Sequence, residues 1–137
     1  MKSKLLFLTL ALIFLAGCAA PPEVPPGDFV LDCPGDKPSP GEDIKVYHKP
    51  ISGEVEEIIL FSRLDYGRSQ IKKAPAAMED DLATASFTVP ESAIGIILYA
   101  AGPKDVRLSN MPSGVFILYD RSGEPVPGTR SWVASAA

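Results

Sequence analysis

The feature that most constrains the fold is a series of short runs rich in Val, Ile, Phe and Tyr, separated at fairly regular intervals by Gly, Pro, Asp and Ser. Runs of about four to eight such residues between turn residues are typical of β-strands. An amphipathic helix would instead need apolar residues three and four positions apart over about ten residues or more. The pattern therefore predicts an all-β domain over residues 28–137.

Two of the runs alternate cleanly between inward and outward side chains. In residues 43–49, Ile44, Val46 and His48 share one face, and residues 82–89 alternate small or apolar side chains with Thr and Ser. Successive side chains of a strand point to opposite faces of its sheet. We therefore expect both runs to be strands with one face on a core.

Other runs differ in polarity and so predict different places in a sheet. Residues 55–64 contain Ile58-Ile59-Leu60-Phe61 in sequence, and their β-branched content between Gly53 and Gly67 favours a central strand over a helix. Residues 94–101 are apolar on both faces, which is expected of a strand buried in the middle of a sheet. Residues 68–73 are short and polar, and their charges suit an edge strand that must not pair with other chains. The Ala-rich, acidic residues 74–81 are expected to form a loop.

About seven strands are thus expected, with a tight turn after the last of them at Asp120-Arg121-Ser122-Gly123. Such a series in about 95 residues is typical of an antiparallel β-sandwich of the immunoglobulin-like or fibronectin-like type. The expected strands are residues 28–33, 43–49, 55–64, 68–73, 82–89, 94–101 and 115–119.

A second pattern lies in residues 85–128, which resemble small β-sandwich modules of some bacterial thioredoxin-like envelope proteins and some carbohydrate-binding modules. In those modules an Asp-Asn-Asn often precedes the last strands, and only Asn110 is kept here. The resemblance implies a sandwich and an accessory role beside an envelope enzyme. It rests on Phe87-Thr88-Val89-Pro90, Ala93-Ile94-Gly95, Ile117-Leu118-Tyr119-Asp120 and Gly123-Glu124-Pro125-Val126-Pro127-Gly128.

The N-terminus is typical of a signal peptide. Lys2 and Lys4 precede about twelve apolar or small residues, whereas a membrane-spanning helix needs about twenty. The run closes on Leu15-Ala16-Gly17-Cys18, which resembles the lipobox of bacterial lipoprotein precursors.

That resemblance implies cleavage between Gly17 and Cys18 and attachment of a diacylglycerol, with acyl chains such as palmitate, to the Cys18 thiol. Two or more acyl chains hold a protein at a membrane almost permanently. In a Gram-negative host Ala19 is not the Asp associated with inner-membrane retention, so the expected location is the outer membrane facing the periplasm. In a Gram-positive host it would be the cell membrane.

Residues 18–27 are expected to tether the domain to its lipid. Half of the fourteen prolines lie between residues 21 and 40, and residues 19–27 read AAPPEVPPG. Such a segment either extends as a polyproline-like spacer of about 28 Å or forms a disordered connector. The expected organisation is a signal peptide at 1–17, the lipidated Cys18 and tether at 18–27, and the sandwich at 28–137.

The net charge of the chain makes some classes of binding partner less favourable. Without the leader, which contains two of the 13 basic residues, 11 Lys and Arg face 17 Asp and Glu. An acidic chain whose densest basic pair is Lys72-Lys73 disfavours nucleic acid and anionic lipid as partners. A chain of this length closes one hydrophobic core, so a single domain is expected.

Residues that carry catalysis or bind metals are few. Cys33 is the only thiol left once Cys18 is lipidated, so no internal disulfide is expected. A buried structural role for Cys33 is favoured over a reactive one. His48 is the single histidine, which excludes the common zinc sites and suits a structural role better than a base.

The remaining motifs predict no catalytic residues, no cofactor and no metal. There is no Gly-x-Ser-x-Gly elbow, no phosphate-binding Gly-rich loop and no Cys-x-x-Cys. The acidic run Glu79-Asp80-Asp81 lacks calcium-loop spacing and is interpreted as a solvated face.

Aromatic side chains are the candidate binding residues. They are Tyr47, Tyr99, Tyr119 and Trp132, with Tyr66 as a fifth ring. Rings of this kind can bind sugars or protein partners, although core packing and burial at strand edges explain most of them more simply. Trp132 either folds back onto the sandwich or is an exposed anchor.

The sequence thus favours a membrane-anchored, non-catalytic envelope lipoprotein whose sandwich presents loops or an edge strand to an envelope protein. Strand addition at residues 68–73 is the first mode to test. A small-ligand or carbohydrate-binding module and an accessory domain of a thioredoxin-like enzyme are the alternatives.

Overall fold

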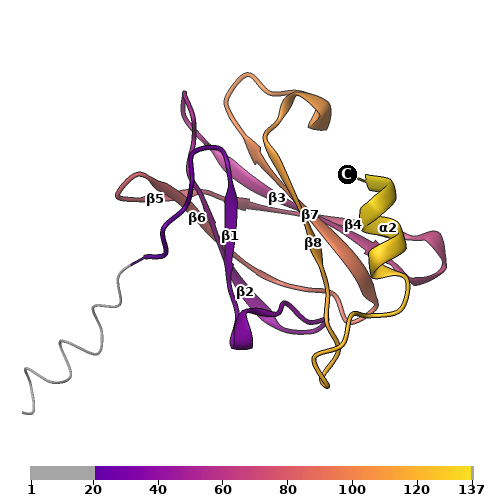
Figure 1. Cartoon of the computed structure of the whole chain (residues 1–137). Coiled ribbons are helices and arrows are strands. Elements are labelled where there is room, and N and C mark those ends of the chain that lie inside the picture. Colours follow the sequence, from indigo (N-terminus) through magenta and orange to yellow (C-terminus); the bar gives the residue numbers. More distant parts are fainter. Residues whose placement is uncertain (1–20, 137) are drawn as a thin grey trace, which may run out of the picture.

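The computed structural model describes residues 21–136, which form two four-stranded antiparallel sheets packed as a sandwich with one short helix at the C-terminal end (Figure 1). The strand order is β1-β2-β6-β5 in one sheet, sheet A, and β4-β3-β7-β8 in the other, sheet B. The predicted signal peptide, its cleavage site and Cys18 lie outside the described residues.

Sheet A consists of β1 (Phe29–Asp32), β2 (Asp43–His48), β6 (Leu82–Thr88) and β5 (Ala77–Glu79). Sheet B consists of β4 (Ser69–Pro75), β3 (Glu57–Leu64), β7 (Ala93–Ala101) and β8 (Ser113–Ile117). Three short 3-10 segments, η1 (Pro34–Asp36), η2 (Asp65–Gly67) and η3 (Leu108–Asn110), lie between strands, and helix α2 (Thr129–Ala136) follows β8.

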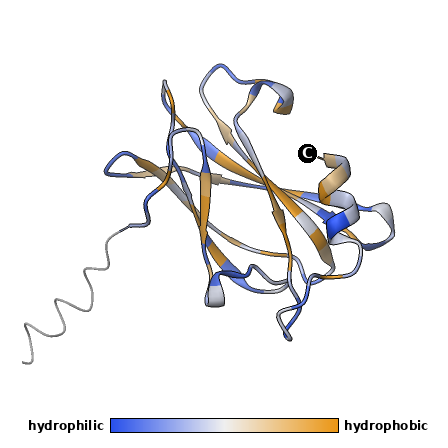
Figure 2. Cartoon of the chain, in the orientation of Figure 1, coloured by the Kyte–Doolittle hydropathy of each residue, from blue (hydrophilic) through white to orange (hydrophobic). Residues whose placement is uncertain are grey.

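The core lies between the sheets and is built from the alternation seen in the sequence. Ile44 and Val46 of β2 face Leu60 of β3 and Leu98 of β7, and all four side chains are buried. Figure 2 shows that hydrophobic stretches lie along strands of both sheets. Each such side chain contributes about 1.5–3 kcal/mol when it leaves water, so this layer is the main source of stability.

All seven expected strands are present, with ends within two residues of the prediction. The expectation of a loop over residues 74–81 was wrong. β4 continues to Pro75, and β5 forms an eighth strand among the described residues. The cause is tertiary: the Ala76 N–H donates to the Glu56 carbonyl, and β5 pairs with β6, although all three β5 residues are exposed and carry no periodic signal.

The strands of the sandwich run between two ends, which differ in the loops that they carry. The proximal end is the one at which the chain enters, where the Gly27 N–H donates to the Lys49 carbonyl. It carries the loops 49–56 and 102–112 and the turn between β5 and β6, because Glu57 pairs with Ala101 and His48 with Ala83. The distal end is the opposite one and carries η1, η2 and the loops 89–92 and 118–128.

The described part of the predicted tether, residues 21–27, lies against the sandwich. Val24 is buried, and it packs with Tyr47 and Leu82 on the outer face of sheet A. One valine in the proline-rich segment thus contacts the domain, and the segment ends in a turn in which the Asp28 N–H donates to the Pro25 carbonyl at 3.0 Å.

Candidate functional site

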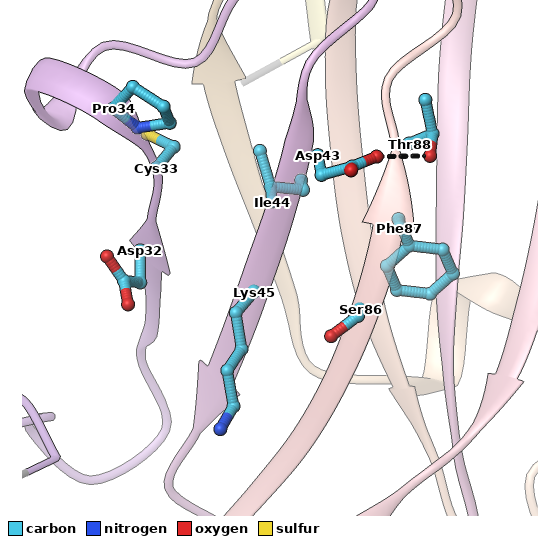
Figure 3. A pocket seen from close by; sticks show the side chains of 9 residues that line it. All are labelled: Asp32, Cys33, Pro34, Asp43, Ile44, Lys45, Ser86, Phe87 and Thr88. Atoms are coloured by element: carbon cyan, nitrogen blue, oxygen red, sulfur yellow. Dashed lines mark hydrogen bonds between the residues drawn. The ribbon is translucent and has the colours of Figure 1, made fainter. Parts of the chain in front are cut away.

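A groove opens on sheet A where β1 ends (Figure 3). The β1–β2 ladder stops at the pair Asp32 and Lys45, because the chain turns inward at Cys33 and Pro34 begins η1. Within residues 21–136 the start of β2 therefore has no paired strand on that side, and a hollow of about 730 Å³ remains. Its lining residues are Asp32, Cys33, Pro34, Asp43, Ile44, Lys45, Ser86, Phe87 and Thr88.

Polar contacts fix the exposed side chains of this groove. Lys45 Nζ donates to Glu79 Oε1 at 3.2 Å and to Oε2 at 3.3 Å, and Thr88 Oγ1 donates to Asp43 Oδ1 at 2.5 Å. The hydrogen bonds to Glu79 raise the pKa of Lys45, because they favour the charged ammonium. Lys45 is therefore a fixed positive charge at the groove and cannot act as a base near neutral pH.

Cys33 lies at the bottom of the groove, and its side chain belongs to the core. Burial, and then the nearby carboxylates of Asp36 and Glu42, raise the pKa of the Cys33 thiol. Both effects disfavour the thiolate, which is the reactive form. The structure thus places Cys33 where a buried structural cysteine was expected.

His48 is also buried, with 1% of its surface exposed, and its ring stacks on Phe29 at a centroid distance of 4.3 Å. Nδ1 lies 2.9 Å from the Asp28 carbonyl oxygen. Because a carbonyl only accepts, Nδ1 carries the proton and Nε2 has a lone pair, which is buried without a hydrogen-bond partner. Burial lowers the pKa of His48, so the ring is neutral at physiological pH.

The four candidate aromatic residues lie on different parts of the molecule. Tyr47 is buried on the outer face of sheet A, whereas Tyr99 lies on β7 in sheet B, where burial raises the pKa of its hydroxyl. Tyr119 lies at the distal end, with Lys37 Nζ 5.1 Å from its ring centroid. The structure therefore does not bring Tyr47, Tyr99, Tyr119 and Trp132 into one row of exposed rings.

Trp132 resolves the alternative that the sequence left open, because it folds back. Helix α2 lays the indole over Gly95 of β7 and parallel to Phe61 of β3, with ring centroids 6.4 Å apart and planes at 13°. A Cβ at Gly95 would stand 2.2 Å from the indole carbon Cε3, so only glycine leaves room for the ring. A glycine inside an apolar strand was the sequence signal for this close approach.

Within residues 21–136, no group of three or more His, Cys, Asp or Glu side chains is placed to hold a metal ion. No helix there combines the length and the apolar character needed to cross a bilayer.

The sequence was also compared with known proteins. A scan of protein-family models and searches of curated proteins and solved structures found no match.

Proposed function

We propose that this chain is a membrane-anchored envelope lipoprotein whose immunoglobulin-like sandwich binds an envelope protein without catalysing a reaction. The lipobox residues Leu15-Ala16-Gly17-Cys18 support the anchor. The strand orders β1-β2-β6-β5 and β4-β3-β7-β8 support the immunoglobulin-like classification, because immunoglobulin sheets combine their strands in a similar order. The observation that carries the binding role is the free edge of β4.

The direction of the backbone groups on β4 follows from the hydrogen bonds at its two ends. The Leu64 N–H donates to the Arg68 carbonyl, and the Ala76 N–H donates to the Glu56 carbonyl, so the even-numbered residues bond to β3. By alternation, the N–H groups of Ser69, Ile71 and Lys73 point away from the sheet. Pro75, which has no N–H, occupies the next position of this outward series.

The side chains of β4 leave this edge accessible. Lys72 Nζ donates a hydrogen bond to the carbonyl of Thr88 in sheet A at 3.0 Å, so its side chain extends toward the other sheet and not along the edge of β4. Ile71 is 52% exposed and continues the row formed with Phe61 and its β7 partner Ile97. An extended segment added to β4 would gain main-chain hydrogen bonds and a side-chain contact with Ile71.

The edge is tested by a pair of substitutions at Lys73. Lys73→Pro removes an outward N–H without breaking a bond to β3, and Lys73→Thr removes the same charge but keeps the N–H. We expect recovery of the partner from detergent-solubilised membranes to fall about tenfold for Lys73→Pro only, since one well-formed hydrogen bond and the fit around it are worth about 1.4 kcal/mol. Equal recovery by both variants would rule out strand addition at β4.

The anchor is tested at the N-terminus of the mature chain. Mass spectrometry should find an acylated Cys18 as the first residue, and Cys18→Ser should release the protein from membranes. An intact N-terminus beginning at Met1 would exclude the lipoprotein assignment.

A further inference from the structure

The docking of Val24 limits how far the sandwich can stand from its anchor. Between Cys18 and Val24 there are six peptide steps, which span at most about 20 Å when fully extended. Val24 is packed on Tyr47 and Leu82, so residues beyond it add no reach. A lipid on Cys18 therefore keeps the proximal end within a short distance of the membrane surface.

Two loops of the proximal end lie next to the entering chain. Ile51, in the loop 49–56, has its Cδ1 atom 2.9 Å from the place that a Cβ of Gly27 would take. The second loop, 102–112, touches the first, because the Glu54 carbonyl oxygen lies 3.0 Å from the corresponding position at Gly102. The entering chain and the two loops thus form one continuous surface.

Each loop holds an aliphatic side chain in solvent. Ile51 is 77% exposed and Val106 is 85% exposed. In the second loop a turn is closed by two hydrogen bonds: the Gly102 N–H donates to Asp105 Oδ2 at 2.9 Å, and the Asp105 N–H donates to the Gly102 carbonyl at 3.2 Å. Val106 follows directly after this turn, and its exposure means that it makes little contact with the domain.

The charged residues of the proximal end indicate whether it would bind an anionic or a zwitterionic lipid surface. Lys49, Lys104 and Arg107 lie within two residues of the exposed aliphatic side chains, where long basic side chains can reach phosphate groups. Acidic residues outnumber these three basic ones: Glu54 and Glu56 lie in the first loop, Asp105 lies in the second, and Asp80 and Asp81 form the turn between β5 and β6. The mixture disfavours attraction to an anionic surface and leaves apolar insertion as the source of binding.

From these observations we infer that Ile51 and Val106 insert into the zwitterionic headgroup layer of the membrane that carries the Cys18 lipid, so that the sandwich stands on its proximal end. This inference rests on the proposed lipid anchor. The lipid and the two loops then hold the domain at several points, and such multiple attachment restricts its tilt. The distal end and the edge of β4 remain available to a protein partner.

The test uses the mature acylated protein in phosphatidylcholine vesicles. An environment-sensitive fluorophore is attached to a cysteine introduced as Ile51→Cys or Val106→Cys, in a Cys33→Ser background. The control is Tyr66→Cys, because Tyr66 is 96% exposed but lies in η2 at the distal end. We expect a blue shift and quenching by nitroxide-bearing lipids at positions 51 and 106, and neither effect at position 66.

A second measurement needs no label or substitution. Amide hydrogen exchange of the acylated protein should slow in the loops 49–56 and 102–112 on vesicles relative to detergent micelles, and η2 should be unchanged. If the protein floats with the vesicles but positions 51 and 106 stay in water and these loops exchange as before, the inference is wrong and the anchor stands. If the protein does not float, both the anchor and the inference are wrong.

Discussion

Tyr66 occupies a backbone conformation that its side chain does not favour. It has φ 60° and ψ 31°, and Gly67 follows with φ 75°, so the turn between β3 and β4 has two successive residues in the left-handed region. Turns of this kind favour Asn-Gly, because asparagine tolerates a positive φ better than an aromatic residue does. Since the ring is 96% exposed, no packing within residues 21–136 compensates for the strain.

Replacing this tyrosine should therefore stabilise the isolated domain. Tyr66→Asn is expected to raise the free energy of unfolding by about 0.5–1 kcal/mol, because it relieves part of the cost of the left-handed conformation. Urea denaturation measures the gain. Tyr66→Val, a β-branched residue at the same φ, should lower stability, and a loss of stability in Tyr66→Asn would contradict the argument.

His48 should make stability depend on pH. Burial lowers its pKa in the folded state below the ordinary value of 6.5, so the unfolded chain binds more protons between those two pKa values. The contribution of His48 to stability is therefore complete above about pH 6.5 and is lost as pH falls toward the folded pKa. The free energy of unfolding, measured from pH 8 downward, should decrease in this window.

The matched variant for this effect is His48→Phe, which can keep a ring stacked on Phe29 but has no proton to bind. It should lose the part of the pH dependence that lies just below pH 6.5. A slope identical to that of the unsubstituted protein would show that other groups cause it.

At the scale of elements, helix α2 is held to the sandwich by a few specific contacts. The Leu118 N–H donates to Thr129 Oγ1 at 3.2 Å in a buried position, and Trp132 covers Gly95. Gly95→Ala should therefore displace the helix and cost about 1–3 kcal/mol, as expected when a methyl group is forced into a filled space. Thermal denaturation measures this loss.

A double-mutant cycle separates the clash from any intrinsic effect of alanine on β7. In a Trp132→Ala background, Gly95→Ala should cost little or even stabilise the strand, because the space is empty and alanine is less flexible than glycine. Equal costs in both backgrounds would mean that Trp132 does not rest on Gly95 in solution.

Sequence patterns predicted correctly those strands whose residues have a local preference for extended structure. β2 and β6 alternate, and β3 and β7 contain Ile-rich runs between turn residues, so local preference and final structure agree. β5 could not be predicted in this way, because Ala77–Glu79 is short and exposed, and its pairing with β6 depends on the path of the chain after β4. Helix α2 was also missed, since a short Ala-rich and Ser-rich segment gives little periodic signal.

At the scale of the whole molecule, the sequence predicted which residues are aromatic but not where their rings would meet. By alternation Tyr47 lies on the face of β2 opposite Ile44, Val46 and His48, yet it is buried there because Val24 from the entering segment packs on it. Trp132 and Phe61 are far apart in the chain and meet only because α2 folds back across sheet B. Such contacts depend on how loops return segments to the sheets, which alternation within one strand does not determine.

The docking of the entering segment gives a prediction at this scale. Val24→Ser should free residues 21–27 from sheet A without unfolding the sandwich, because it removes one buried apolar side chain at the periphery and costs about 1–2 kcal/mol. Limited proteolysis should then cleave this segment faster. Thermal denaturation should stay cooperative, and a Val30→Ser variant serves as control, because Val30 is only partly buried in the same cluster.

The passage of the chain from β4 to β5 joins the two sheets through the single residue Ala76. On that side the two sheets are joined by the backbone, so they cannot separate there without breaking the hydrogen bonds between β4 and β3 or between β5 and β6. On the opposite side, within residues 21–136, β1 and β8 are not joined directly by the chain. They approach each other there through Phe29, which lies against Gly114. Transient opening should therefore begin between β1 and β8, and any process that peels the domain apart, by force or by heat, should start on that side.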